Sequence, residues 1–147
     1  MPVLFDSSVY IEALRAGSDA PLLMQRWAGD SPIWLSSVVL EELYAGAGPG
    51  IVPLLEKLER DFEGVKRVLT PTPKDWVRTG RILAQIGHKY GYEQVGKSWL
   101  TNDTLIATSA ARHGITVMTA NGRDFARLAE FCSLQWEAIS LLPKPGT

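Results

Sequence analysis

Short apolar runs alternate along the chain with longer stretches of helical pattern. Residues 2–5 are apolar and stop at Asp6, which predicts a buried strand. Four more short runs fit strands, at residues 33–35, 65–69 and 115–119 and, as an edge strand, at 134–139. Helical stretches separate most of these runs, and helical crossovers join parallel neighbours. The pattern therefore predicts an α/β fold with a mainly parallel, short-stranded central sheet.

Capping residues mark where the helices begin and end. Ser7 or Ser8 offers the first cap, Ser36 or Ser37 the third, and Thr72 is followed by Pro73, which favours a helix start. The stretch HKYGYEQVGKSWLTN, residues 88–102, is polar and contains glycine, and we interpret it as a loop. The expected helices span residues 7–16, 19–28, 38–47, 51–63, 73–87, 103–113 and 121–129.

The bulk composition excludes several classes of protein. The chain has 147 residues, enough for one core, and its net charge of −1 argues against a strongly basic nucleic-acid binder. The lone Cys132 forms no internal disulfide and supplies no thiolate cluster. The first residues have no basic segment, and no apolar run approaches the roughly 20 residues of a membrane span. We expect a cytoplasmic protein with one domain over residues 1–142 and a frayed tail at 143–147.

Two acidic residues follow predicted strands. Asp6 comes directly after the first strand, and Asp124 lies a few residues after the fourth. Ligands in such sheets gather beyond the carboxyl ends of the strands. Taken alone, Asp6 is also suited to capping a helix, and Asp124 to a variant of the capping box with Asn121.

Two more acids lie on predicted helices. On a wheel of about 100° per residue, Glu41 points to water and Glu42 lies on the flank of the buried face. Asp103 stands at the predicted start of an Ala-rich helix, where the helix dipole favours an acid in any case. If these carboxylates meet Asp6 and Asp124 in one cleft, their repulsion calls for a cation, and oxygen ligands suit Mg²⁺ or Mn²⁺. Such an ion activates water and stabilises a phosphodiester transition state.

Four segments of the chain resemble the PIN-domain ribonucleases, in particular VapC-like toxins of toxin–antitoxin pairs. LFDSSVYIE resembles the opening strand with its first acid, and the acid–Leu–x–x–Gly pattern in SVVLEELYAG selects Glu42 over Glu41. DTLIATSAARHGITVMT resembles the segment of the third acid, Asp103, and TANGRDF that of the fourth, Asp124. One departure is Ser8, where the family commonly has Asn. A second is Thr104, where Ala is frequent.

The resemblance implies a PIN-like three-layer α/β/α fold and a Mg²⁺- or Mn²⁺-dependent endoribonuclease. It implies that Asp6, Glu42 and Asp103 hold the principal ion, and that Asp124 helps to hold it or a second one. Ser7 and Asn121 would support these ligands by hydrogen bonds. In-line attack of water on phosphorus would leave a 5′ phosphate and a 3′ hydroxyl. The implied partners are RNA, a second copy in a homodimer, and a small antitoxin encoded beside it.

Other residues near the expected site have two interpretations each. Arg123, beside Asp124, and Lys97 are the best candidates for contacts with RNA phosphates. Arg15 and Arg112 are further candidates, although solvated surface charge explains all four as well. Trp99 is suited to stacking on a base, or equally to packing at a dimer interface.

Two other classes of protein with an α/β fold need acidic residues that this sequence lacks. A phosphatase of the haloacid-dehalogenase type needs a second Asp two residues after the first, where this chain has Ser8. A response-regulator receiver needs an Asp ending a middle strand, but the third strand ends in Leu69 and Thr70. The alternative left open is a PIN-like module that binds RNA or protein without cutting. Metal-dependent cleavage, lost on Asp6→Asn, separates it from the enzyme.

Overall fold

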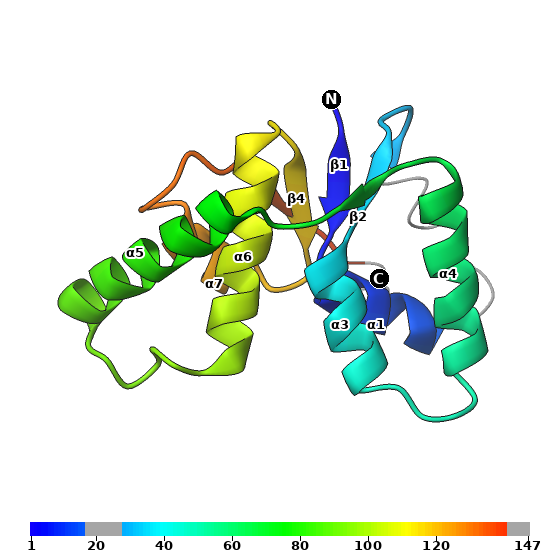
Figure 1. Ribbon diagram of the computed structural model, residues 1–147, viewed down its shortest axis with the longest axis horizontal. Helices are drawn as coiled ribbons and strands as arrows, with labels where there is room; N and C mark the ends of the chain where they lie inside the picture. Colours follow the sequence, from blue (N-terminus) through cyan, green and yellow to red (C-terminus); the bar gives the residue numbers. More distant parts are fainter. Residues whose placement is uncertain (17–27, 141–147) are drawn as a thin grey trace, which may run out of the picture.

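A five-stranded, entirely parallel sheet forms the centre of the protein (Figure 1). It is described from a computed structural model that covers residues 1–16 and 28–140. The strand order is β3-β2-β1-β4-β5. The strands are β1 (Val3–Phe5), β2 (Ile33–Ser36), β3 (Val68–Leu69), β4 (Thr116–Thr119) and β5 (Trp136–Ala138). The predicted α/β fold with a parallel sheet is therefore confirmed.

The order of the strands reverses between β1 and β4. From β1 the chain moves outward to β2 and β3, then crosses back to β4 and continues to β5 on the other side. In open parallel sheets, this reversal leaves a crevice at the carboxyl ends of the two central strands. The residues that follow β1 and β4 therefore lie where a ligand site is expected.

Helices accompany the sheet on both sides of β1. Figure 1 shows α1, α3 and α4 grouped on one side, and α5, α6 and α7 on the other. Within the described residues the helices are α1 (Ser7–Ala16), α3 (Ser37–Ala45), α4 (Val52–Gly64), α5 (Pro73–Tyr90), α6 (Ser98–Arg112) and α7 (Gly122–Leu128). The expected helix at 19–28 and the expected tail at 143–147 lie outside the described residues, apart from residue 28.

The interpretation of residues 88–102 as one loop is wrong. Helix α5 continues to Tyr90 and is capped by Gly91, whose φ of 93° is a positive value that glycine adopts readily. Helix α6 begins at Ser98, because Leu100 is buried in the core and fixes the first turn there. Only residues 91–97 connect the two helices. The third strand is also shorter than expected, two residues instead of five.

The core of the sheet is made of the apolar strand residues that the sequence pattern singles out. Leu4, Phe5, Leu35 and Val117 are fully buried, and α6 contributes Ile106 and two small alanines to the same core. Burial of side chains of this size is the main favourable contribution to folding.

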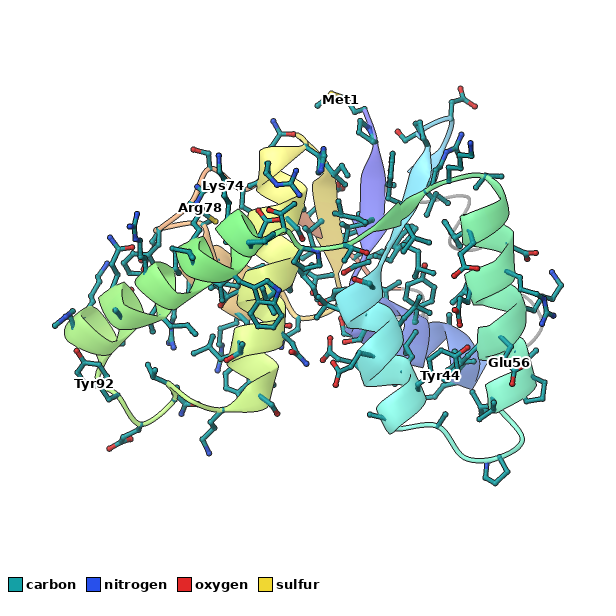
Figure 2. All side chains as sticks on the ribbon, viewed as in Figure 1. Met1, Tyr44, Glu56, Lys74, Arg78 and Tyr92 are labelled. Carbon is teal, nitrogen blue, oxygen red and sulfur yellow. The ribbon has the colours of Figure 1, made fainter. Side chains whose placement is uncertain are left out.

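Polar contacts fix the helices that flank the site. The Tyr44 hydroxyl on α3 donates to Glu59 Oε1 on α4 at 2.8 Å, and Figure 2 shows Tyr44 between these two helices. Between α5 and α6, the hydroxyls of Thr79 and Thr108 lie 3.2 Å apart in the buried interface. The helices that carry site residues are therefore held by directional contacts in addition to packing.

Candidate active site

Four acidic residues from four separate segments line one cavity of about 270 Å³ at the carboxyl edge of the sheet. They come from the β1–α1 junction, from α3, from α6 and from α7. The cavity is lined by Asp6, Ser7, Ser8, Glu42, Trp99, Asp103, Asn121 and Asp124. The structure therefore brings together all four acids and both supporting residues that the sequence singled out.

Asp6 lies at the bottom of this arrangement and is 3% exposed. Its Oδ2 accepts a hydrogen bond from the Thr119 hydroxyl at 2.7 Å, and its Oδ1 accepts one from the Ser8 hydroxyl at 2.5 Å. The Val9 amide donates a longer bond to Oδ1, at 3.4 Å. Asp6 thus caps α1 itself, which is one of the two roles that the sequence suggested for it, and the cap expected at Ser7 or Ser8 lies one or two residues too late. Burial raises the pKa of Asp6, and these donors act against the increase.

Glu42 projects from α3, whose N-cap residue is Ser36, where the serine hydroxyl accepts from the Val38 amide. Burial, then the charges of Glu41 and Asp6, raise the pKa of Glu42 to about 6, and the Ser7 side chain partly offsets this. One oxygen, Oε1, is buried and has no hydrogen-bond partner within the described residues.

Glu41 lies outside this arrangement. It is exposed, and its Oε2 accepts a hydrogen bond at 3.1 Å from Asn102 on α6. The separation of the two neighbouring glutamates follows from their positions on the helix, as the wheel predicted.

Asp103 lies in the second turn of α6, five residues after its first residue. The expectation that it opens the helix is therefore wrong, because the helix starts at Ser98. Burial, followed by the charges of Asp6, Glu42 and Asp124, raises the pKa of Asp103 to about 8. The packing of α6 therefore brings the Asp103 carboxyl close to the acids of the other segments. An interaction with the end of the helix does not account for its position.

Asp124 lies in the first turn of α7, where Asn121 is the N-cap residue. The Asn121 side chain makes no capping bond to the helix; its Nδ2 donates to Asp124 Oδ2 at 2.6 Å. The variant of the capping box considered from the sequence is therefore not formed. Asn121 holds the orientation of the Asp124 carboxylate instead.

Two hydroxyl residues that the sequence analysis did not assign to the site connect its halves. Ser8 donates to Asp6 and accepts from the Ala120 amide at 3.0 Å. Thr119 donates to Asp6 and accepts from the Asn121 amide at 2.9 Å. The β1–α1 junction is thereby bonded to the turn after β4. The signal available in the sequence was the place of Thr119 as the last residue of a strand, two residues before Asn121.

The cationic candidates separate into two groups. Lys97, the N-cap residue of α6, and Arg123, on α7, are exposed, and no ion pair to either occurs within the described residues. Arg112 is engaged elsewhere, because its guanidinium binds both carboxylate oxygens of the buried Asp75 at 2.9 Å. An RNA contact for Arg112 is therefore not supported.

The donor set fits a hard divalent cation. All four candidate ligands are carboxylates, and burial together with the neighbouring carboxylates raises the pKa values of Glu42 and Asp103. The buried, unpartnered Glu42 Oε1 is an oxygen that an ion would satisfy. In the described part of the chain, no three such side chains are close enough to form a ready-made metal site.

Fold and cavity together define an α/β protein with an acidic site at the carboxyl edge of a parallel sheet. The PIN domain family matches residues 3–131, and the chain belongs to that family. Membership supports a hydrolase that acts on nucleic acid. No curated protein matches the sequence at a significant level.

Several solved structures share the fold. VapBC2 from Rickettsia felis, bound to a DNA fragment from its promoter, is 21% identical, with a TM-score of 0.69 over 95% of this chain and 100% of that chain. DNA-bound VapBC from Salmonella typhimurium is 25% identical, with a TM-score of 0.64 over 94% and 98%. FitAcB from Neisseria gonorrhoeae is 24% identical, with a TM-score of 0.59 over 92% of this chain and 96% of that chain.

Among the described helices of this chain, none is long and apolar enough to cross a membrane.

Proposed function

We propose that this chain is a Mg²⁺- or Mn²⁺-dependent endoribonuclease and the toxin of a VapBC-type pair. The observation that carries the proposal is the convergence of four acids, from segments as far apart as residues 6 and 124, on one cavity. Paired or clustered carboxylates of this kind are costly to bury together unless they bind cations. Because the chain belongs to a family that supports hydrolysis of nucleic acid, a catalytic cation would explain why these carboxylates are buried together.

The proposed roles follow the positions of the side chains. Asp6, Glu42 and Asp103 would hold the principal cation, and Asp124 would hold it from the α7 side or hold a second one. When bound, the cation lowers the pKa of water and stabilises charge on the phosphate. Asp6 keeps its orientation through the Ser8 and Thr119 hydroxyls, and Asn121 keeps that of Asp124.

The residues around the acids complete the proposal. Ser7, whose side chain lowers the pKa of Glu42, would support that carboxylate, and the exposed Lys97 and Arg123 would contact phosphates of the RNA strand. Neutral or cationic groups at the rim are needed because an acidic cavity by itself repels a polyanion.

The likeness to VapBC and FitAcB structures supports a partner protein. We propose a small antitoxin, encoded beside this chain, that inhibits it, and a homodimer of this chain in the cytoplasm. Co-purification of the chain with the product of the adjacent short gene tests the first part. Light scattering of the free chain tests the second.

The central experiment is cleavage of end-labelled RNA by the purified chain with Mg²⁺, with Mn²⁺ or with EDTA. We expect internal cleavage with either metal and none with EDTA. Asp103→Asn should abolish it while the fold is kept, whereas Glu41→Gln, which retains the acceptor for Asn102, should cleave like the wild type. DNA of the same sequence serves as the substrate control.

Two results would count against the proposal. Full activity of Asp103→Asn removes the site assignment. RNA binding without cleavage under any metal condition favours the non-catalytic module.

A further inference from the structure

Asn102 connects α6 to α3 beside the acidic cavity. Its Nδ2 donates to Glu41 Oε2 at 3.1 Å, although the two residues are 61 positions apart in the sequence. Neither residue lines the cavity, but each immediately precedes one that does, Glu42 on α3 and Asp103 on α6. The bond therefore joins the two helices directly beside their candidate cation ligands.

Helical preference does not explain an asparagine at this position. Asn102 is the fifth residue of α6, and the N-cap residue of that helix is Lys97. Asparagine is favoured at the N-cap of a helix, but it is a poor helix former in the interior. The contact across to α3 therefore explains Asn102 better than a role within α6 does.

This contact opposes a repulsion between the same two helices. Burial, then the charges of Asp6 and Glu42, raise the pKa of Asp103 to about 8. The like charges of Glu42 and Asp103 thus oppose a close approach of α3 and α6 at the cavity. A hydrogen bond from an amide to an ionised carboxylate is attractive and about twice as strong as a neutral one. The bond from Asn102 to Glu41 therefore acts against the repulsion.

The amide of Asn102 also acts on Glu42 itself. Burial and then the charge of Glu41 raise the pKa of Glu42, and a side-chain hydrogen bond from Asn102 is one of the contacts that lower it. An amide nitrogen has two N–H groups, so one side chain on α6 can serve both glutamates of α3. Asn102 thus bears on the ligand and on its neighbour at once.

We propose that Asn102 is a positioning residue that fixes α6 against α3 through Glu41, so that Glu42 and Asp103 reach the same divalent cation. The proposal rests on the proposed function, because it takes these two carboxylates as cation ligands. Asn102 and Glu41 bind neither the cation nor RNA. Glu41 thereby has a role that needs its oxygen and not its charge.

Calorimetric titration of the full chain with Mn²⁺ tests this without RNA. Asn102→Leu keeps the approximate size of the side chain and removes the donor. It should weaken Mn²⁺ binding about 10-fold, the low end of the range for residues that orient metal ligands. Glu41→Ala should weaken binding similarly, whereas Glu41→Gln loses the same charge but keeps an oxygen acceptor and should bind close to the wild type. The two variants at Glu41 therefore separate the hydrogen bond from the charge.

A double variant and a matched control complete the set. Once Glu41→Ala has removed the acceptor, adding Asn102→Leu should cost less affinity than it does in the wild type, because the two changes break a shared contact. Thr79→Val is the control. It removes the 3.2 Å contact with the Thr108 hydroxyl, which also joins α6 to another helix but lies outside the cavity. Its Mn²⁺ affinity should equal that of the wild type.

Melting temperatures in EDTA distinguish positioning from a purely structural role. A bond that only joined two helices would lower the melting temperature of Asn102→Leu and leave its Mn²⁺ affinity unchanged. That result overturns the proposal, and so does equal Mn²⁺ affinity of Glu41→Ala and Glu41→Gln.

RNA cleavage, measured beside Mn²⁺ binding, keeps the two proposals apart. Mn²⁺ binding that depends on Asn102, in a chain that cleaves no RNA, supports positioning and refutes the nuclease function. Mn²⁺-dependent cleavage, with Mn²⁺ binding that is indifferent to Asn102, supports the nuclease function and refutes positioning. A wild-type chain that binds neither Mn²⁺ nor Mg²⁺ refutes both.

Discussion

The hydroxyl of Thr119 donates a 2.7 Å hydrogen bond to Oδ2 of Asp6, across 113 positions of sequence. Thr119 ends β4 and Asp6 follows β1, and these strands are neighbours in the sheet. The same hydroxyl accepts from the Asn121 amide, so one oxygen fixes an acid of the site and the turn toward α7. Residues that orient ligands in this way commonly change metal affinity when they are replaced.

The first prediction concerns this bond. Thr119→Val keeps the shape of the side chain and removes the donor, so Asp6 loses one of its two hydroxyl partners. We expect metal affinity, measured by calorimetry, to fall about 10- to 100-fold. The control is Thr116→Val on the same strand, because the Thr116 hydroxyl donates to the exposed Gln135, outside the site. Equal affinities for the two variants would show that Thr119 does not orient Asp6.

The second prediction concerns stability against pH without metal. The pKa of Asp103 is raised to about 8, so the folded state binds its proton more tightly than the unfolded state. The stability contributed by Asp103 therefore declines as pH rises from about 4, the ordinary range of an Asp, to about 8. Asp103→Asn removes this contribution and should melt about 3 °C or more above the wild type at pH 8, a difference of about 1 kcal/mol.

Melting curves from pH 5 to 8 in EDTA measure this effect. The difference between Asp103→Asn and the wild type should shrink toward acid pH, and Glu41→Gln should not show it. If the melting temperatures of Asp103→Asn and the wild type differ by the same amount at every pH, then burial and the neighbouring carboxylates do not raise the pKa of Asp103.

The third prediction concerns the ion pair of Asp75 and Arg112. Burial alone would raise the pKa of Asp75, but the bonds from Arg112 and Thr72 outweigh it, and the pKa is lowered. Arg112→Met should cost about 3 kcal/mol at pH 7, the low end for breaking a buried pair, because Arg112 is 33% exposed. Lys57→Met, which breaks an exposed pair with Asp61, should cost about 0.5 kcal/mol or less.

Urea unfolding at two pH values measures the third prediction. A carboxyl with a lowered pKa stabilises the fold above its ordinary pKa, near 4, and this is lost as pH falls through the lowered value. The difference between Arg112→Met and the wild type should therefore narrow as pH falls. The narrowing should begin above pH 4, because burial raises the pKa of Asp75 once Arg112 is gone. Similar losses for Arg112→Met and Lys57→Met would contradict the assignment of a strong pair.

The fourth prediction compares two glycines of α5. A Cβ at Gly87 would overlap the ring of Tyr92, which folds back on the helix and whose hydroxyl lies 3.2 Å from a nitrogen of the His88 ring. Figure 2 shows Tyr92 beyond the end of α5. Gly87→Ala should displace the exposed ring, and the lost contacts should offset the gain in helix propensity, so we expect it to be neutral or to destabilise by up to about 1 kcal/mol.

Gly80 provides the control for the fourth prediction. It is exposed in the middle of α5, and a Cβ there meets nothing within 4 Å. Gly80→Ala should stabilise by about 0.8–1.0 kcal/mol, the difference in helix propensity between the two residues. Thermal unfolding of both variants measures this, and the same sign for both would refute the role of Tyr92.

The sequence predicted correctly those features of the fold and site that depend on local pattern. Asp6 follows an apolar run that forms a strand, and Glu42 was separated from Glu41 by its angle on a helix, an assignment supported by the resemblance. The position of Asp103 in α6 was wrong, because burial of Leu100 extends that helix against the polar pattern around it. Tertiary packing decides such boundaries.

The connections between segments were beyond a single sequence. The bonds from Ser8 to Ala120 and from Thr119 to Asp6 exist only because β1 pairs with β4, and pairing partners leave no mark in either strand alone. The same holds for Arg112, which was considered for RNA but meets Asp75 through α5–α6 packing.

The pairing of β1 with β4 also sets when the protein acquires its site during synthesis. Asp6 leaves the ribosome before the other three acids of the site, and Thr119, Asn121 and Asp124 emerge only after five of the six described helices. A nascent chain that stops before β4 holds three of the four acids but lacks the Thr119 donor and one of the two strands that pair with β1. Under the proposed function, truncated products of translation would be harmless, and only a chain completed through α7 would need its antitoxin.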